Sequence, residues 1–165
     1  MYYETTYKSP IGNIILACDG EHLVGLWNEG QKYFKSGIKD MVKKEDFPVF
    51  DKTKQWLDKY FAGKEPAISE LPLAPGGSEF RKQVWELLCE IPYGETTTYG
   101  DIAKKMAIKM NRESMSGQAV GGAVGHNPIS IIIPCHRVVG ADGSMTGYAG
   151  GIDKKIKLLE HEQRE

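Results

Sequence analysis

TYGDIAKKMAIKMNRESMSGQAVGGAVGHNP, residues 98–128, is the stretch that decides how the second half of the chain folds. Thr98 and Asp101 have the spacing of a capping box, with Asp in place of the usual Glu or Gln, so we expect a helix to begin at about Thr98. Another helix is expected from about Ser116 to Gly125. A helix, a short connection and a further helix form the outline of a helix-turn-helix motif.

The later of these two helices is rich in glycine, although each glycine inside a helix costs roughly 0.5–1 kcal/mol relative to alanine. A face with almost no side chains allows another backbone to come close. This leaves two interpretations, tight packing against another helix or insertion into a groove of nucleic acid. Lysines in the preceding helix favour nucleic acid, because they can contact phosphates. The glycines are Gly117, Gly121, Gly122 and Gly125, and the lysines are Lys104, Lys105 and Lys109.

The first half of the chain reads as a small antiparallel sheet with one helix. Three short strands are expected, separated by turn signals that contain Pro, Gly, Asn and Asp. The apolar residues of 47–61 recur near helical spacing and predict a helix that Gly63 ends. We expect this helix to pack on one face of the sheet. The expected strands are residues 2–7, 14–18 and 23–27.

Residues 63–77 are rich in Pro, Gly and Ala, a composition typical of an interdomain connection. We place the boundary near Pro75, which gives an N-terminal domain of residues 1–75 and a C-terminal domain of residues 76–165. The other expected elements are a helix capped by Ser78, a buried strand over 129–133, and a last helix from 153 to about 163 with Ile156 and Leu159 facing inward.

With 165 residues, 41% of them hydrophobic and 26% charged, the chain has the composition of an ordinary globular protein. It contains no apolar run long enough to span a bilayer and no signal-peptide pattern, so we expect a cytoplasmic location. A formal net charge of -1 implies that any contact with nucleic acid is local. Cys18, Cys89 and Cys135 are expected to be free thiols. Cys18 and His22 lack further ligands nearby, so no metal site is predicted.

IIIPCHRVVG, residues 131–140, places a thiol, an imidazole and a guanidinium side by side behind a proline. A cysteine after an apolar strand is more often a buried small hydrophobe than a nucleophile. Pro134 cannot continue a central sheet ladder, so the chain should leave the sheet here and bring Cys135 to a pocket edge. His136 and Arg137 would then lower the pKa of the thiol. Direct contact between Cys135 and His136 needs a turn or a bridging water, and the pair alone leaves both interpretations open.

Four motifs in this order resemble the methylated-DNA-protein-cysteine methyltransferases, also called O6-alkylguanine-DNA alkyltransferases. The resemblance is most specific from Phe80 to Glu162. It implies an α+β fold, in which a small N-terminal antiparallel sheet with a helix, of ribonuclease-H-like topology, is joined to a mainly helical, winged-helix-like C-terminal domain. The motifs are IPYGETTTYGDIA (91–103), AVGGAVGHNPISII (119–132), PCHRVVG (134–140) and TGYAGGIDKK (146–155).

The resemblance also implies a reaction that uses no cofactor. Cys135 would attack the alkyl carbon on O6 of a damaged guanine, and the resulting thioether would consume the protein after one turnover. His136 matches the residue that takes the thiol proton through a water, and Glu162 matches the carboxylate that orients that imidazole. Asn127 matches the hinge asparagine that supports the site. Tyr99 matches the tyrosine that protonates N3 as guanine departs.

Recognition of the base and of DNA is implied in the same way. Tyr148 matches the pocket-wall tyrosine on which the flipped base stacks, and the backbones of Val138 and Ala149 match groups that read its edge. The glycine-rich helix of the family enters the minor groove of double-stranded DNA. Where the family commonly has an arginine that fills the hole left by the base, this chain has a glutamine without that charge. The residues expected at the DNA are Gln118, Ala119, Gly121, Gly122, Thr98 and Ser116.

Three other classes of protein remain as alternatives. A non-enzymatic protein that binds alkylated DNA would share the fold but lack the thiol of Cys135. A helix-turn-helix regulator would not explain Cys135, His136 and Glu162 together, and a cysteine hydrolase would not explain the glycine-rich helix. We expect a monomer that associates with the nucleoid when bound to DNA. The range of alkyl groups accepted, and whether O4-alkylthymine is a substrate, stay open.

Overall fold

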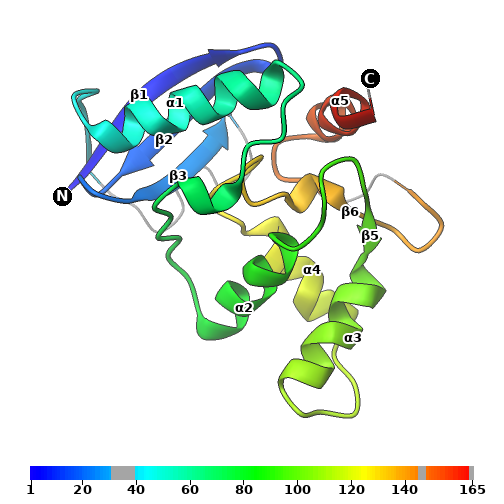
Figure 1. The fold of residues 1–165 in the computed structure, drawn as a ribbon. Helices are drawn as coiled ribbons and strands as arrows, with labels where there is room; N and C mark the ends of the chain where they lie inside the picture. The colour runs from blue at the N-terminus through cyan, green and yellow to red at the C-terminus, as the bar shows by residue number, and fades with distance from the viewer. Residues whose placement is uncertain (31–39, 145–147, 164–165) are drawn as a thin grey trace.

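The computed structural model describes residues 1–30, 40–144 and 148–163, and the first two residues of the 146–155 motif lie outside these ranges. The described chain begins with a four-stranded sheet in the order β3-β2-β1-β4 (Figure 1). Its strands are β1 (Tyr2–Ser9), β2 (Gly12–Cys18), β3 (Leu23–Asn28) and β4 (Met41–Lys43).

The three predicted strands are confirmed, and they pair antiparallel along the chain. The sequence did not predict β4, which pairs parallel with β1 through Tyr2↔Met41 and Tyr3↔Val42, so the sheet is mixed. A strand of three residues, of which two are exposed, has too little alternation of apolar and polar residues to be recognised.

The predicted N-terminal helix is α1 (Pro48–Phe61), which lies across one face of the sheet (Figure 1). Pro48 stands in its first turn, where the missing N–H costs nothing, and Gly63 follows its end at a φ of 86°. One face of α1 is buried. The buried residues of that face are Val49, Phe50, Thr53, Trp56, Leu57 and Tyr60.

Three helices of the second half begin at the predicted residues, each with a side-chain cap. They are α2 (Glu79–Leu88), α3 (Tyr99–Lys109) and α4 (Gly117–Gly125). The hydroxyl of Ser78 accepts from Arg81 N at 3.2 Å, that of Thr98 from Asp101 N at 3.1 Å, and that of Ser116 from Ala119 N at 3.2 Å. Each cap satisfies one of the backbone donors that a helix leaves free at its start.

The last helix, α5 (Ile152–Gln163), is confirmed, but one of its two predicted inward residues is wrong. Leu159 is buried, whereas Ile156 is 37% exposed. The inward positions are those of Lys155, Leu158, Leu159 and Glu162. Two charged residues therefore occupy the face that a purely apolar pattern would assign to hydrophobic side chains.

The predicted strand over 129–133 is also wrong. Only Ile129 forms a bridge, to Leu26 of β3, and the chain then closes into turns with Ile131 at a φ of 70°. Ile132 N donates to Ser130 O at 2.8 Å and Ile133 N donates to Ile129 O at 3.1 Å. A short apolar run shows that a segment is buried, but it does not distinguish a strand from a compact turn.

One hydrophobic core joins both halves of the chain. It contains buried residues of the sheet and α1 together with residues of the helices and of the turn at 129–133. The short 3₁₀ turn η1 (Ile68–Glu70) lies on the connection between the halves. No helix in the described ranges is long and apolar enough to cross a membrane.

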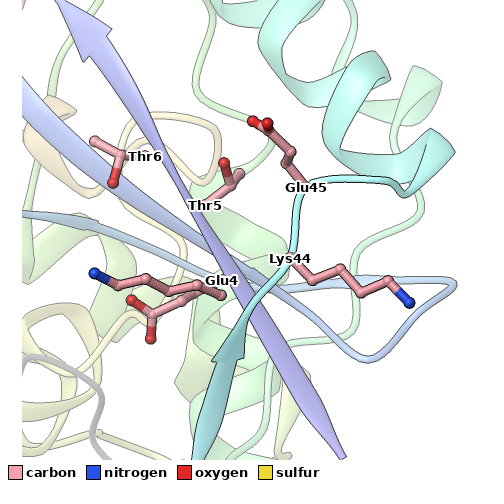
Figure 2. A pocket seen from close by; sticks show the side chains of 6 residues that line it. Glu4, Thr5, Thr6, Lys44 and Glu45 are labelled. Carbon is pink, nitrogen blue, oxygen red and sulfur yellow. The ribbon is translucent and has the colours of Figure 1, made fainter.

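A hollow of about 370 Å³ lies where β4 joins β1 at the edge of the sheet (Figure 2). Residues expected at the reaction or at DNA do not contribute to it, so it lies apart from the candidate site. Its lining residues are Glu4, Thr5, Thr6, Lys43, Lys44 and Glu45.

Candidate functional site

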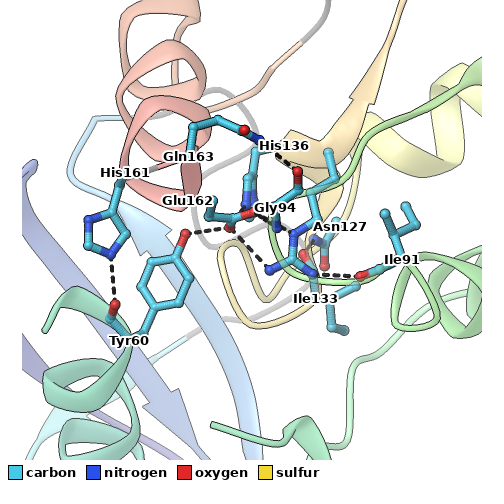
Figure 3. A network of polar contacts seen from close by, with 10 residues as sticks. Tyr60, Ile91, Gly94, Asn127, Ile133, His136, His161, Glu162 and Gln163 are labelled. Atoms are coloured by element: carbon cyan, nitrogen blue, oxygen red, sulfur yellow. Dashed lines mark hydrogen bonds and ion pairs between the residues drawn. The ribbon is translucent and has the colours of Figure 1, made fainter. Parts of the chain in front are cut away.

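Asn127 holds the turn that leads to the predicted nucleophile (Figure 3). Its side-chain Nδ2 donates to Ile133 O at 2.8 Å, and its Oδ1 accepts from Ile129 N at 3.0 Å. Both ends of the turn are thus tied to one buried amide. The turn is also fixed to β3, because Ser130 N donates to Leu26 O at 3.0 Å.

After this turn the chain forms the 3₁₀ turn η2 (Cys135–Arg137) and the short strand β6 (Val138–Val139). Strand β6 pairs parallel with β5 (Thr97–Thr98), which runs directly into α3. The pairing therefore places the Cys135 segment beside the start of α3, where Tyr99 is the first residue. The ring of Tyr99 reaches α4, since its Cδ1 lies 4.0 Å from the place that a Cβ on Gly121 would take.

Cys135 is a nearly buried thiol, 6% exposed. Burial raises its pKa to about 11, although the Asn127 side chain and the charge of Lys155 act in the opposite direction. His136 and Arg137 were expected to lower this pKa, but the groups that do so are Asn127, Lys155 and Ser130, and burial outweighs them. At pH 7 a thiol with such a pKa is ionised in only about one molecule in ten thousand, so nucleophilic attack needs a base.

His136 is fully buried, and its Nε2 lies 2.5 Å from Oε2 of Glu162 (Figure 3). Burial lowers the pKa of His136, while the Glu162 carboxylate acts to raise it. The other ring nitrogen, Nδ1, has no hydrogen-bond partner in the described part of the chain. Cys135 and His136 are neighbours in the 3₁₀ turn η2, and no direct hydrogen bond joins their side chains in the described part of the chain.

Glu162 is the centre of the polar network. Its carboxylate accepts from Arg137 Nε at 2.8 Å and Arg137 Nη2 at 3.1 Å, and from Gly94 N at 3.2 Å. Burial alone would raise the pKa of Glu162, but His136 and Arg137 outweigh it and hold this pKa well below its usual range. Arg137 also donates from Nη1 to Ile91 O at 2.7 Å. Arg137 thus serves the carboxylate rather than the thiol.

Two further polar groups of the site were missed by the sequence. The side chain of Lys155 is fully buried, its Nζ donates to Val138 O at 2.5 Å, and its charge favours ionisation of Cys135. Burial lowers the pKa of Lys155. Tyr60 of α1 donates from its hydroxyl to Glu162 Oε2 at 2.6 Å. The position of Lys155, one helical turn before the inward Leu159, was a signal in the sequence that it is buried. The sequence contains no local signal for the contact of Tyr60 with Glu162.

The residues expected to hold the base lie around the same segment. Tyr148 is 8% exposed, and burial raises its pKa, with the neighbouring Cys135 acting in the same direction. Gly150 permits this packing, because a Cβ there would lie 2.7 Å from Cε2 of Tyr148 and 2.5 Å from Nδ2 of Asn28. Ala149, which lies between Tyr148 and Gly150 in the sequence, is half-buried. The carbonyl of Val138 already accepts from the buried lysine.

Helix α4 presents one exposed face. Gln118, Ala119 and Gly122 are exposed on it, whereas Val120, Ala123 and Val124 are buried. A Cβ added at Gly122 or Gly125 would have no neighbour within 4 Å, and the same holds for Gly117. Packing inside the chain therefore does not require these glycines, which argues against helix packing as their reason.

The charges near α4 are modest. Lys104 and Lys105 of α3 are exposed, but Lys109 pairs with Glu86 at 3.0 Å. The Thr98 and Ser116 hydroxyls serve as helix caps.

Two family models together match most of the chain. A model described as 6-O-methylguanine DNA methyltransferase, DNA binding domain, matches residues 79–164, and one described as the ribonuclease-like domain of the same protein matches residues 1–75. The methylated-DNA--protein-cysteine methyltransferase of Methanosarcina mazei is 45% identical over 166 residues, which cover 99% of this chain and 98% of that protein. The Haemophilus influenzae protein of the same name is 40% identical over 161 residues, 98% of this chain and 86% of its own.

Solved structures agree with these relatives. The crystal structure of Mycobacterium tuberculosis O6-methylguanine methyltransferase has a TM-score of 0.80 and 37% identity, and covers 99% of this chain and 93% of that one. The structure of OGT from the same organism in complex with DNA has a TM-score of 0.81 and 40% identity, and covers 98% and 92%.

Proposed function

The chain belongs to the 6-O-methylguanine DNA methyltransferase family, and we propose that Cys135 is the residue that accepts the alkyl group from O6 of guanine in DNA. As a methylated-DNA--protein-cysteine methyltransferase it repairs DNA by direct reversal, without removing the base. The substrate is double-stranded DNA that contains O6-alkylguanine. The observation that carries the assignment is the buried series of Cys135, His136 and Glu162, in which the carboxylate fixes the imidazole at 2.5 Å.

The reaction begins with loss of the thiol proton. Because Nε2 of His136 is committed to Glu162, Nδ1 is the nitrogen that takes the proton of Cys135, through a bridging water. The sulfur then forms a bond to the alkyl carbon while the bond from that carbon to O6 breaks. Tyr99 donates its hydroxyl proton to N3, so that neutral guanine leaves. The S-alkylcysteine has no easy leaving group, and each molecule therefore reacts once.

The base must leave the helix to reach a thiol that is 6% exposed. Tyr148 provides the wall on which the flipped guanine stacks, and the backbones of Val138 and Ala149 read its edge. Asn127 supports the turn under the thiol through its two hydrogen bonds.

Helix α4 approaches the minor groove with its exposed face. The open space around Gly122 supports this role, because a small-residue face with no packing partner among the described residues leaves room for the sugar-phosphate walls. Gln118 fills the gap left by the flipped base, with Ala119, Gly121, Thr98 and Ser116 around it. The protein acts as a monomer in the cytoplasm, on the nucleoid when bound to DNA.

Intact-mass measurement tests this assignment. After incubation with duplex DNA that carries O6-methylguanine, we expect one addition of about 14 Da, the mass of one methylene, on the peptide that contains Cys135. Cys135→Ala should gain no mass and should still bind the DNA, since the groove contacts do not use the thiol. Binding without mass gain in the wild type would point to a lesion-binding protein or a regulator. Repeated turnover that leaves the protein unmodified would point to a hydrolase.

A further inference from the structure

One oxygen of Glu162, Oε2, has hydrogen bonds to His136, to Tyr60 and to Nη2 of Arg137. Oε2 lies 2.5 Å from Nε2 of His136 and 2.6 Å from the hydroxyl of Tyr60, which is 102 residues away in α1 (Figure 3). The N-terminal half of the chain thereby contacts the carboxylate that orients the proposed base. The hydroxyl, the imidazole and the Arg137 guanidinium share this acceptor atom, so removal of the hydroxyl bond alters the bond to the imidazole.

The hydroxyl of Tyr60 is held firmly in place. The residue is 1% exposed, and its ring stacks on Trp56 with centroids 5.8 Å apart and planes inclined by 7°. Tyr93 meets the ring edge-on at 5.9 Å, and Nε2 of His161 lies 2.7 Å from the Tyr60 carbonyl oxygen. None of these contacts involves the exposed face of α4.

We propose that Tyr60 is a positioning residue for alkyl transfer. Its hydroxyl acts through Glu162 and sets the strength of the hydrogen bond between that carboxylate and His136. This inference rests on the proposed roles of His136 and Glu162. It gives the N-terminal half a part in the chemistry besides its part in the core.

The direction of the effect follows from competition at the carboxylate. A hydrogen bond to an ionised acceptor takes up part of its charge. With the Tyr60 hydroxyl removed, Glu162 interacts more strongly with His136, and the pKa of His136 rises. The protonated imidazole cannot accept the thiol proton. The other charged or titratable groups around His136, Glu162 and Tyr60 are Lys155 and His161 from α5, Cys135 and Arg137 from η2, Tyr93 after α2, and Tyr148.

Tyr60→Phe tests the proposal in single-turnover transfer from O6-methylguanine DNA, measured against pH. We expect the acid limb of the rate profile to move up by about one pH unit, so that the rate falls about tenfold at acid pH and little on the alkaline plateau. The matched control is Tyr7→Phe, which removes the same hydroxyl from a 2.6 Å bond to Asp58, an exposed carboxylate of α1. Tyr7→Phe should leave the profile where it is.

We expect a second substitution to shift the acid limb of the pH–rate profile in the opposite direction, to lower pH. Fluorotyrosine at position 60 is a stronger donor, so the acid limb should move down while the ring packing is retained. An equal slowing at every pH in Tyr60→Phe, or shifts of the same direction in both proteins, would reduce Tyr60 to a structural role. Failure of the wild type to transfer the methyl group would instead overturn the proposed function, which separates the two outcomes.

Discussion

Gly122→Ala separates the stability of α4 from its proposed contact with DNA. A methyl group at this position meets no atom within 4 Å, and Gly122 is not among the glycines with positive φ. The substitution should therefore stabilise the fold by roughly 0.5–1 kcal/mol, the usual difference between glycine and alanine in a helix. For a chain of this size that is a rise of about 1–4 °C in the melting temperature.

The same methyl group should weaken DNA binding. If α4 lies in the minor groove, the added carbon meets sugar or phosphate, and overpacking of a closed contact costs about 1–3 kcal/mol, which is about 5- to 150-fold in Kd. Fluorescence anisotropy with an O6-methylguanine duplex, in a Cys135→Ala background, measures this. Gly125→Ala, at the last residue of α4 and equally open, is the control. Equal affinities for both variants and their parent would refute the groove interpretation.

Three further predictions concern the proposed residues. Glu162→Gln leaves the guanidinium of Arg137 buried without its counterion, and should lower the stability at pH 7 by about 3–5 kcal/mol in denaturant unfolding. Because the pKa of Glu162 is depressed in the folded state, its stabilising effect is complete above the unfolded pKa of about 4.3 and is lost as the pH falls; a difference from wild type that does not shrink in acid contradicts this. Gln118→Arg should tighten DNA binding and steepen its salt dependence by about one phosphate contact, and unchanged affinity would count against it. Tyr99→Phe should slow transfer without abolishing it, and an unaltered rate in a quenched single-turnover assay would remove Tyr99 from the role of proton donor.

The parts of the fold that the sequence predicted are those with local causes. Ser78, Thr98 and Ser116 each accept a bond from an N–H three residues ahead, a pattern that reads directly from the chain. Strand β4 exists only because β1 offers a free edge, and residues 129–133 turn because Asn127 ties their ends together. Such contacts are decided by tertiary structure. The domain boundary near residue 75 stays a prediction.

The candidate site shows the same difference between features with local causes and features decided by tertiary contacts. The family resemblance singled out Cys135, His136 and Glu162. The structure brings His136 and Glu162, which are 26 residues apart, into contact. The sequence assigned Arg137 to the thiol, because adjacent residues were assumed to act on one another. In the structure Arg137 binds Glu162 through two of its nitrogens. The sequence did not predict a role for Tyr60, because its hydrogen bond to Glu162 joins one half of the chain to the other.

The placement of positive charge explains how a thiol with a raised pKa can serve a protein that reacts once. Lys155 stands on the thiol side and favours the thiolate, while Arg137 stands behind Glu162 and keeps that carboxylate ionised. Burial nevertheless keeps Cys135 protonated at rest, and a protonated thiol reacts poorly with oxidants or stray alkylating agents. In the proposed mechanism the thiolate becomes available only when His136 accepts the proton. Ionisation of the Cys135 thiol thereby depends on His136 and Glu162, and the single reaction of each molecule is reserved for the base that reaches the sulfur.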